Sequence, residues 1–288
     1  MPAETKRTPI IEIHQLVKTF GTQRVLDGIS LDVYPGEIMV VLGGSGCGKS
    51  TLLRHLIGSL YPDEGTVKLF GRDITMMSEP EFNKVRKRFG ILFQSGALFN
   101  SLTVGENVAL PLREHTDLDE STIEIMVKIK LELVGLRRHA DKMPAQLSGG
   151  MKKRAGLARA VALDPQILFY DEPSAGLDPV TRAQIDQLII DLTRKLHVTS
   201  MVVTHNMYSA FTIADRMCIL DKGRILKMGS RKEFESLRDS YPETLKSEQD
   251  KLIRQFLRGD AQGPITDRST SSDYEDDLLM VSLKDETQ

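Results

Sequence analysis

The stretch that decides the fold of this chain is IMVVLGGSGCGKS, residues 38–50. Its five leading residues form an uninterrupted apolar run, as expected for a strand that is covered on both faces in a parallel sheet. The residues that follow fit the pattern G-x-x-x-x-G-K-[ST], and a helix is predicted over residues 49–60. A strand, this pattern and a helix in succession predict a phosphate-binding loop rather than an ordinary glycine-rich turn.

The residue types in this loop suit a nucleoside triphosphate. Glycines let backbone N–H groups converge on phosphate oxygens, and the following helix directs its positive end towards them. Lys49 would neutralise phosphate charge and Ser50 would ligate Mg²⁺. Cys47 is interpreted as a spacer, because it has no thiol neighbour in the loop. The predicted nucleotide-binding residues of this segment are Gly43, Gly44, Ser45, Gly46, Cys47, Gly48, Lys49, Ser50 and Thr51.

The segments around the loop follow an α/β pattern. Residues 10–20 and 25–33 partly alternate apolar and polar side chains, which predicts antiparallel strands. Short apolar strands are predicted again at 167–170, 199–203 and 217–220, separated by helices at 179–196 and 207–214. The segment 95–163 shows helical patterns, including 118–134, and no convincing strand. This order predicts a parallel α/β sheet with an inserted helical segment.

Composition narrows the class of protein. The 288 residues include 38 basic and 40 acidic side chains, for a net charge of -2, which argues against a strongly basic nucleic-acid binder. The run 152–154 (KKR) is interpreted as a solvated or dimer-facing helical turn, because three charges release few counterions from a nucleic acid. With two cysteines, no leader-like start and no apolar run near the roughly 20 residues of a spanning helix, a cytosolic chain is expected.

A pair of carboxylates ends the strand predicted at 167–170. Metal-dependent phosphoryl transfer needs one acid for Mg²⁺ and one group that orients water. Asp171 would serve the ion and Glu172 the water. An acidic strand end without a catalytic role is the alternative, and the presence of the phosphate loop makes it less favoured.

The segment Leu147-Ser148-Gly149-Gly150-Met151 resembles the signature of ATP-binding cassette (ABC) ATPases. A hydroxyl and two glycines at a helix start form a second anion site, whose N–H groups can bind a γ-phosphate. The resemblance implies a P-loop NTPase ABC cassette with a parallel core sheet, an antiparallel β subdomain and an inserted helical subdomain. It also implies ATP and Mg²⁺ as ligands, and a head-to-tail homodimer in which Ser148, Gly149 and Gly150 face the partner's ATP. Met151 replaces the usual Gln, for which we expect altered tuning rather than inactivity.

Four further positions match the family in order along the chain. Phe20 resembles the aromatic residue that stacks on adenine, and Asp178 belongs to a segment that resembles the D-loop at the dimer seam. Gln94 resembles the Q-loop glutamine that links Mg²⁺ and the attacking water to the helical subdomain. His205 resembles the switch histidine, which would hydrogen-bond the γ-phosphate and hold Glu172 and water in line. The resemblance thus gives Glu172, His205 and Gln94 as catalytic residues, and Ser50, Gln94 and Asp171 as Mg²⁺ ligands.

A finer resemblance is to the Mla branch, which drives phospholipid transport across the bacterial envelope. It is carried by FQSGALF at 93–99, PLREH at 111–115, the signature with its basic follow-on, and RQFLRG at 254–259. It implies a MlaE-type permease dimer, a Mce-domain lipid-binding protein and a STAS-domain protein as partners, no nucleic acid, and a peripheral location on the cytoplasmic face of the inner membrane. Residues 96–99 are candidate permease contacts, with packing inside the helical subdomain as the alternative.

Three other functions stay open at this point. An ABC ATPase for another cargo, such as amino acids, would share every motif, because the cassette does not touch cargo. A soluble, non-transport ABC ATPase would usually carry two cassettes or a long insertion. A small-molecule kinase would share the phosphate loop but lack the second anion site.

The predicted boundaries place the cassette at residues 8–242, with its helical subdomain at about 95–165. An amphipathic helix extension is predicted at 243–265, and we hypothesise that it docks across the dimer. Residues 266–288 are predicted to be a disordered acidic tail, since residues 259–288 hold eight acidic and two basic side chains.

Overall fold

The computed structural model describes residues 8–245 and 247–266. The chain divides into two compact units, Met1–Met228 and Gly229–Gln288, which are described separately. Of the predicted acidic tail, 267–288 lie outside the described residues. Among the described residues, no helix combines the length and the apolar character that crossing a bilayer requires.

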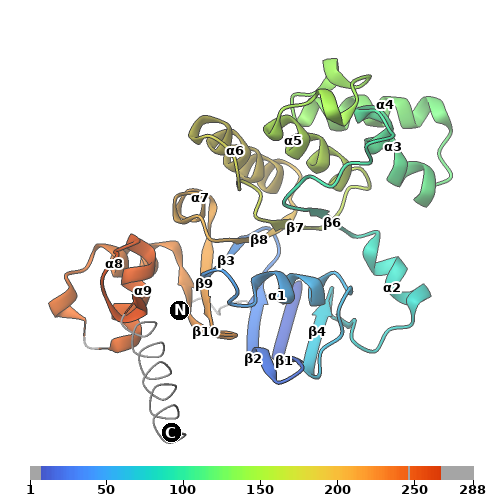
Figure 1. The fold of residues 1–288 in the computed structure, drawn as a ribbon. Helices are drawn as coiled ribbons and strands as arrows, with labels where there is room; N and C mark the ends of the chain where they lie inside the picture. The colour runs from blue at the N-terminus through green and yellow to red at the C-terminus, as the bar shows by residue number, and fades with distance from the viewer. Residues whose placement is uncertain (1–7, 246, 267–288) are drawn as a thin grey trace, which may run out of the picture. The chain divides into compact units, whose positions relative to one another are not determined.

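A six-stranded sheet forms the centre of the first unit (Figure 1). Its strand order is β10-β9-β3-β8-β7-β6, and β3 pairs in parallel with both β8 and β9. The five residues of β3 are fully buried, as its apolar run predicted. The bounds are β3 Ile38–Leu42, β6 Phe89–Leu92, β7 Ile167–Asp171, β8 Thr199–Thr204, β9 Arg216–Asp221 and β10 Arg224–Ser230.

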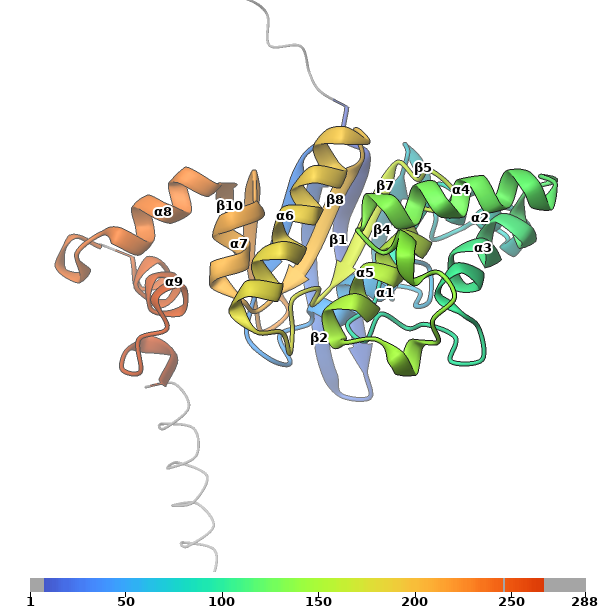
Figure 2. The same ribbon diagram turned by 90° about the horizontal axis from the view of Figure 1, so that it is seen from above.

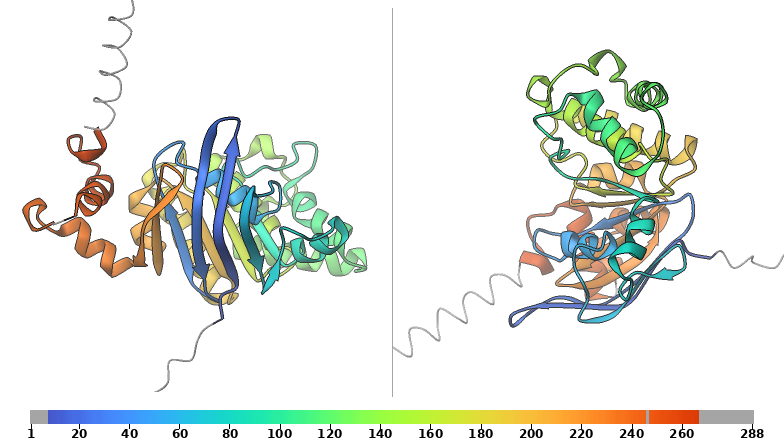
Figure 3. Two further views of the ribbon diagram at one scale, coloured as in Figure 1. Left: turned by 90° about the horizontal axis from the view of Figure 1, so that it is seen from below. Right: turned by 90° about the vertical axis from the view of Figure 1, so that its right-hand side faces the viewer.

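A four-stranded antiparallel sheet lies beside the parallel one, with order β2-β1-β4-β5. Figure 3 shows its long strands β1 and β2 from below. Its inward side chains form one core with β3, β7, β8 and the leucines of α1, so α1 is held between the two sheets. The bounds are β1 Ile11–Phe20, β2 Gln23–Val33, β4 Glu64–Leu69, β5 Arg72–Asp73 and α1 Lys49–Leu56.

Helices cover the other face of the parallel sheet and fill the predicted insertion. α6 packs on β8, as Figure 2 shows from above, and α7 packs on β3. Between β6 and β7 the chain is helical, and α5 packs against α3 and α4. The bounds are α2 Glu79–Arg86, α3 Val104–His115, α4 Glu120–Leu133, α5 Gly149–Ala160, α6 Pro179–Lys195 and α7 Met207–Ile213, with 3-10 turns at Arg137–His139 and Pro144–Gln146.

The second unit is a helical pair. α8 spans Arg231–Asp239, a 3-10 turn spans Pro242–Thr244, and α9 spans Glu248–Arg258, where the amphipathic helix was predicted. Leu252, Ile253 and Leu257 of α9 are buried, and α9 packs against α8, whose Phe234 is fully buried. Part of the apolar face of α9 therefore has a partner within its own unit.

Candidate nucleotide site

The phosphate loop joins β3 to α1 at the edge where the parallel strands end. Gly48 stands at the start of α1 with φ of 110°, and no side chain caps this helix. A Cβ at Gly48 would lie 2.9 Å from the Val25 carbonyl oxygen, so only glycine fits this backbone. The first N–H groups of α1 lack intrahelical acceptors and are available to an anion.

Lys49 lies inside the loop rather than in solvent. Its ammonium donates to the carbonyl oxygens of Gly43 at 2.8 Å and Gly44 at 2.7 Å. These contacts hold the charge where phosphates would meet the loop. Among the remaining predicted loop residues, those exposed to solvent are Gly44, Ser45, Gly46 and Ser50, those buried are Gly43 and Cys47, and Thr51 is half-buried.

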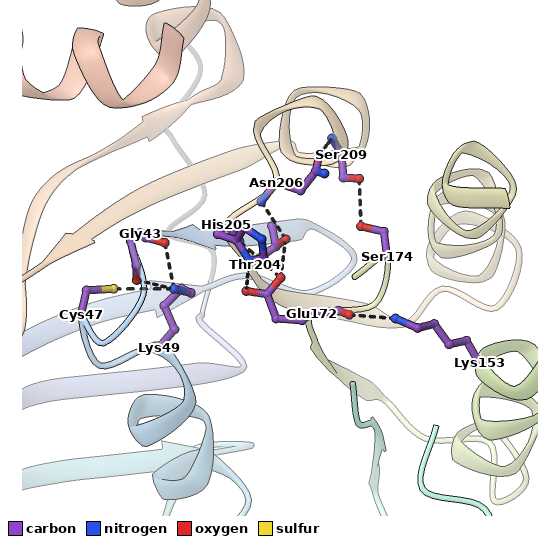
Figure 4. Close-up of polar contacts among 11 residues, drawn as sticks. Gly43, Cys47, Lys49, Lys153, Glu172, Ser174, Thr204, His205, Asn206 and Ser209 are labelled. Carbon is purple, nitrogen blue, oxygen red and sulfur yellow. Dashed lines mark hydrogen bonds and ion pairs between the residues drawn. The ribbon is translucent and has the colours of Figure 1, made fainter. Parts of the chain in front are cut away.

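Asp171 and Glu172 stand at the end of β7. Burial and the neighbouring Glu172 raise the pKa of Asp171, against the opposing charges of Arg54 and Lys49. Glu172 has a left-handed backbone with φ of 47°. Its Oε2 accepts from the Thr204 hydroxyl at 3.0 Å, and its Oε1 lies 2.8 Å from Nδ1 of His205 (Figure 4). The structure thus brings Glu172 and His205, two of the three predicted catalytic side chains, into contact.

Gln94 and Asp171 line one shallow cavity. Gln94 follows β6, the neighbour of β7 in the sheet, and is exposed. The cavity has a volume of about 510 Å³ and is lined by Phe93, Gln94, Ser95, Asp171, Ala175 and Gly176. Gln94 and Asp171 therefore border a common space, as the assignment of both to one ion requires.

The predicted second anion site lies at the start of α5, in the helical segment. The Ser148 hydroxyl caps this helix by accepting from Met151 N at 3.3 Å. A Cβ at Gly150 would lie 2.4 Å from Thr181 Cγ2, so glycine is needed where α5 approaches α6. Asp178 caps α6 through the N–H groups of Val180 and Thr181, at 3.0 Å each.

Figure 4 shows Lys49 and Lys153, which lies on α5, on opposite sides of Glu172. One copy of the chain therefore carries the phosphate loop and the second anion site at separate places.

Phe20, at the end of β1, is 46% exposed, and the Lys18 ammonium lies 5.8 Å from its ring. Its ring is accessible for stacking.

Lys153 differs from the prediction. We expected a solvated or dimer-facing side chain, but Lys153 is only 5% exposed. Its ammonium donates to the carbonyl oxygen of Glu172 at 3.1 Å, and burial lowers its pKa to about 8, against the attraction of Glu172. Helical spacing gives the signal that was missed, because Gly150, Lys153 and Leu157 share the buried face of α5.

The sequence did not predict a contact between two buried hydroxyl groups, those of Ser174 and Ser209. Ser174, two residues after Glu172, lies with its Oγ 3.1 Å from that of Ser209 on α7. Asn206 joins this group to the histidine loop, because its N–H donates to Thr204 and its side chain caps Ser209 N. The segments after β7 and β8 are therefore connected by polar contacts.

Comparison with known proteins places the chain in a family. The family model for ABC transporters matches residues 26–175. The probable ribonucleotide transport ATP-binding protein mkl of Mycobacterium leprae is 45% identical over 255 residues, which cover 88% of this chain and 70% of that protein. The intermembrane phospholipid transport system ATP-binding protein MlaF of Escherichia coli K12 is 42% identical over 270 residues, 94% of this chain and 96% of that protein. This chain belongs to the ABC transporter family.

A solved ABC cassette confirms the predicted fold class. The dimeric cassette MJ0796, in a post-hydrolysis state bound to ADP and Pi, is 30% identical and superposes with a TM-score of 0.71, over 77% of this chain and 98% of that one. The chain is an ABC ATPase, as predicted.

The signature of this ABC ATPase ends in Met151 instead of the usual Gln. In the structure, Met151 contributes its backbone N–H to the Ser148 cap. That contact is available to any residue except proline. The cap of the signature helix is therefore independent of the missing amide.

The two thiols of this ABC ATPase should differ in reactivity. Burial raises the pKa of Cys47 above its ordinary 9.0, although Lys49 opposes the shift. Because the thiolate is the reactive form, iodoacetamide should label Cys47 slowly near neutral pH and faster as the pH rises, and bound ATP should slow the reaction. Burial raises the pKa of Cys218 to about 12, so this thiol should stay unlabelled while the protein is folded.

Mass spectrometry of timed samples checks this expectation, with the unfolded protein as the reference for both thiols. Labelling of native Cys47 at the rate of a free thiol near neutral pH would contradict it.

Proposed function

We propose that this ABC ATPase is the ATP-hydrolysing subunit of a Mla-type transporter that powers phospholipid transport across the bacterial envelope. The observation that carries the proposal is the extent of the match to MlaF, which covers 94% of this chain and 96% of that protein. At that coverage the match extends into the helical unit that follows Met228. The proposed cassette is 8–242, with its helical subdomain at about 95–165 and the extension at 243–265.

A second candidate is ribonucleotide transport, because mkl is slightly more identical, at 45%. The match covers only 70% of that protein. The chain thus matches MlaF over nearly the whole of both proteins and mkl over a part of the latter, which favours phospholipid.

In the proposed site, the loop from Gly43 to Thr51 binds the phosphates of ATP and Phe20 stacks on adenine. Ser50, Gln94 and Asp171 would hold Mg²⁺, and their hydroxyl, amide and carboxylate oxygens are the hard ligands this ion prefers. The ion would neutralise charge on the transferred phosphoryl group. The common cavity of Gln94 and Asp171 supports these two members of the set, and Ser50 is not among the residues that line it.

Glu172 and His205 would orient the attacking water. Their contact at 2.8 Å supports this pairing, and it is positioning rather than acid–base chemistry that His205 would supply. Since the signature stands apart from the loop in one copy, we propose that ATP binds between the loop of one subunit and Ser148, Gly149 and Gly150 of a second. Asp178 would lie at the seam of this homodimer.

For the permease we propose a groove of about 770 Å³ that is bordered by α2, by β6 and the loop after it, by α3 and by α5. Ala97 and Phe99, two of the four predicted contacts, line it together with Pro111 and Arg159. A MlaE-type permease dimer would hold the ATPase at the cytoplasmic face of the inner membrane. A Mce-domain lipid-binding protein and a STAS-domain protein are the further proposed partners.

The test is purification of the complex from membranes, followed by mass spectrometry of its bound small molecules and ATPase assays in lipid discs. Bound phospholipid and phospholipid-stimulated ATP turnover are expected. Bound ribonucleotide with stimulation by ribonucleotides would favour the second candidate. A chain that purifies without any spanning partner would overturn the transport proposal.

A further inference from the structure

Lys153 connects two parts of the molecule that would serve different nucleotides. It lies on α5, four residues after Gly149, where that helix begins. At the rise of about 1.5 Å per residue, Lys153 is little more than one helical turn from Gly149 of the signature. Its side chain points to Glu172 of its own chain (Figure 4).

The burial of Lys153 is costly and calls for a reason. An ammonium group loses favourable hydration when it is buried, and an apolar side chain of similar length would pack there at lower cost. The Glu172 carbonyl oxygen also accepts from Ala175 N at 3.2 Å, so this oxygen does not depend on Lys153 for a partner. A purely structural need would be met by methionine.

Glu172 is held from several sides. Its N–H donates to the Val203 carbonyl oxygen at 2.9 Å, and its left-handed backbone is a conformation that non-glycine residues adopt at a cost. Thr204 and His205 hold its carboxylate, and Lys153 holds its carbonyl group. Of these contacts, the one from Lys153 comes from the signature helix.

We infer that Lys153 is a positioning residue: it holds Glu172 in place for hydrolysis and links it to the signature helix. The inference rests on the proposed roles of Glu172 and Ser148. In the proposed dimer, α5 meets the ATP of one site while Glu172 of the same chain serves the other. Because a helix moves as a rigid element, engagement of the signature at one site would shift the contact that orients Glu172 in the other.

The test compares Lys153→Met with Lys153→Arg, which keeps a charged donor, and with Lys152→Met, the same change on the preceding, partly exposed residue. We expect Lys153→Met to lower kcat about 10- to 100-fold, the size of effect that a misplaced catalytic group produces. ATP affinity and thermal stability should not fall. Lys153→Arg should recover most of the loss, and Lys152→Met should resemble the native protein.

A double-mutant cycle with Ser148→Ala tests the link to the signature. If Lys153 transmits the engagement of Ser148, the two losses in kcat combine to less than their product. Losses that multiply would overturn the link. The positioning role would be overturned if Lys153→Met left kcat unchanged. It would also be overturned if the Met and Arg variants lost kcat equally and both were less stable. If the Met variant does not fold, Lys153→Gln gives a polar variant for the same comparison.

Glu172→Gln is measured in parallel to separate this inference from the proposed function. If Glu172→Gln is inactive and Lys153→Met is fully active, the inference fails and the proposed site stands. If Glu172→Gln turns over ATP rapidly, the proposed site itself is wrong.

Discussion

Glu172→Gln should lower ATP turnover by about 10²- to 10⁴-fold, the usual contribution of a group that handles the attacking water. The change keeps the size of the side chain and an oxygen that can accept from His205 Nδ1, at 2.8 Å in the native protein. It removes the negative charge that would orient and polarise water. The phosphate loop is untouched, because Lys49 contacts Gly43 and Gly44.

ATP binding should therefore persist, and the variant should accumulate as an ATP-bound dimer. Single-turnover phosphate release measures ATP hydrolysis, a nucleotide-binding assay measures the affinity for ATP, and light scattering with ATP measures the amount of dimer. Glu124→Gln, the same chemical change on the exposed surface of α4, is the matched control and should behave as the native chain. Rapid turnover by Glu172→Gln would refute the assignment of Glu172 as the water-positioning group.

Much of the fold was predictable because its signals are local. The run 38–42 predicts a buried strand, and the structure confirms β3 with all five residues buried. The helix over 179–196 is confirmed as α6, with Asp178 as its cap. By contrast, β4 carries only two buried side chains, Val67 and Leu69, and half-exposed short strands give too few positions for a period to be recognised.

The candidate site likewise has a part that could be predicted from the sequence and a part that could not. Loop, carboxylates and signature are contiguous motifs, so their residues could be named from sequence. Helical spacing places Lys153 on the buried face of α5, but its partner could not be named, because the Glu172 carbonyl group lies 19 positions away and meets α5 only in the folded chain. The contact between Ser174 and Ser209 is likewise made across 35 positions by two different segments. Such partners are set by tertiary structure, and local patterns do not report them.

The proposed dimer predicts a second large effect, at the signature. Ser148→Asp should lower ATP turnover by about 10²-fold or more, comparable to losing a group that stabilises the transition state. Aspartate is as good a helix cap as serine, so it can take over the bond to Met151 N, and its charge suits a helix start. Placed against the γ-phosphate of the opposing ATP, that same charge would repel it. Ser148→Asn, a neutral cap, is the matched control and should keep most activity.

Mixing subunits shows whether the signature acts on its own nucleotide or on the partner's. Lys49→Ala removes the phosphate-binding ammonium, and chains carrying this change or Ser148→Asp alone should be nearly inactive. Monomers of the two variants, combined equally before ATP is added, should form mixed dimers with one site that carries both defects and one that carries neither. About a quarter of all sites should then complete a single turnover, because half of randomly paired dimers are mixed. Since a signature that served its own subunit would leave every site defective, the absence of any recovery would exclude the head-to-tail arrangement.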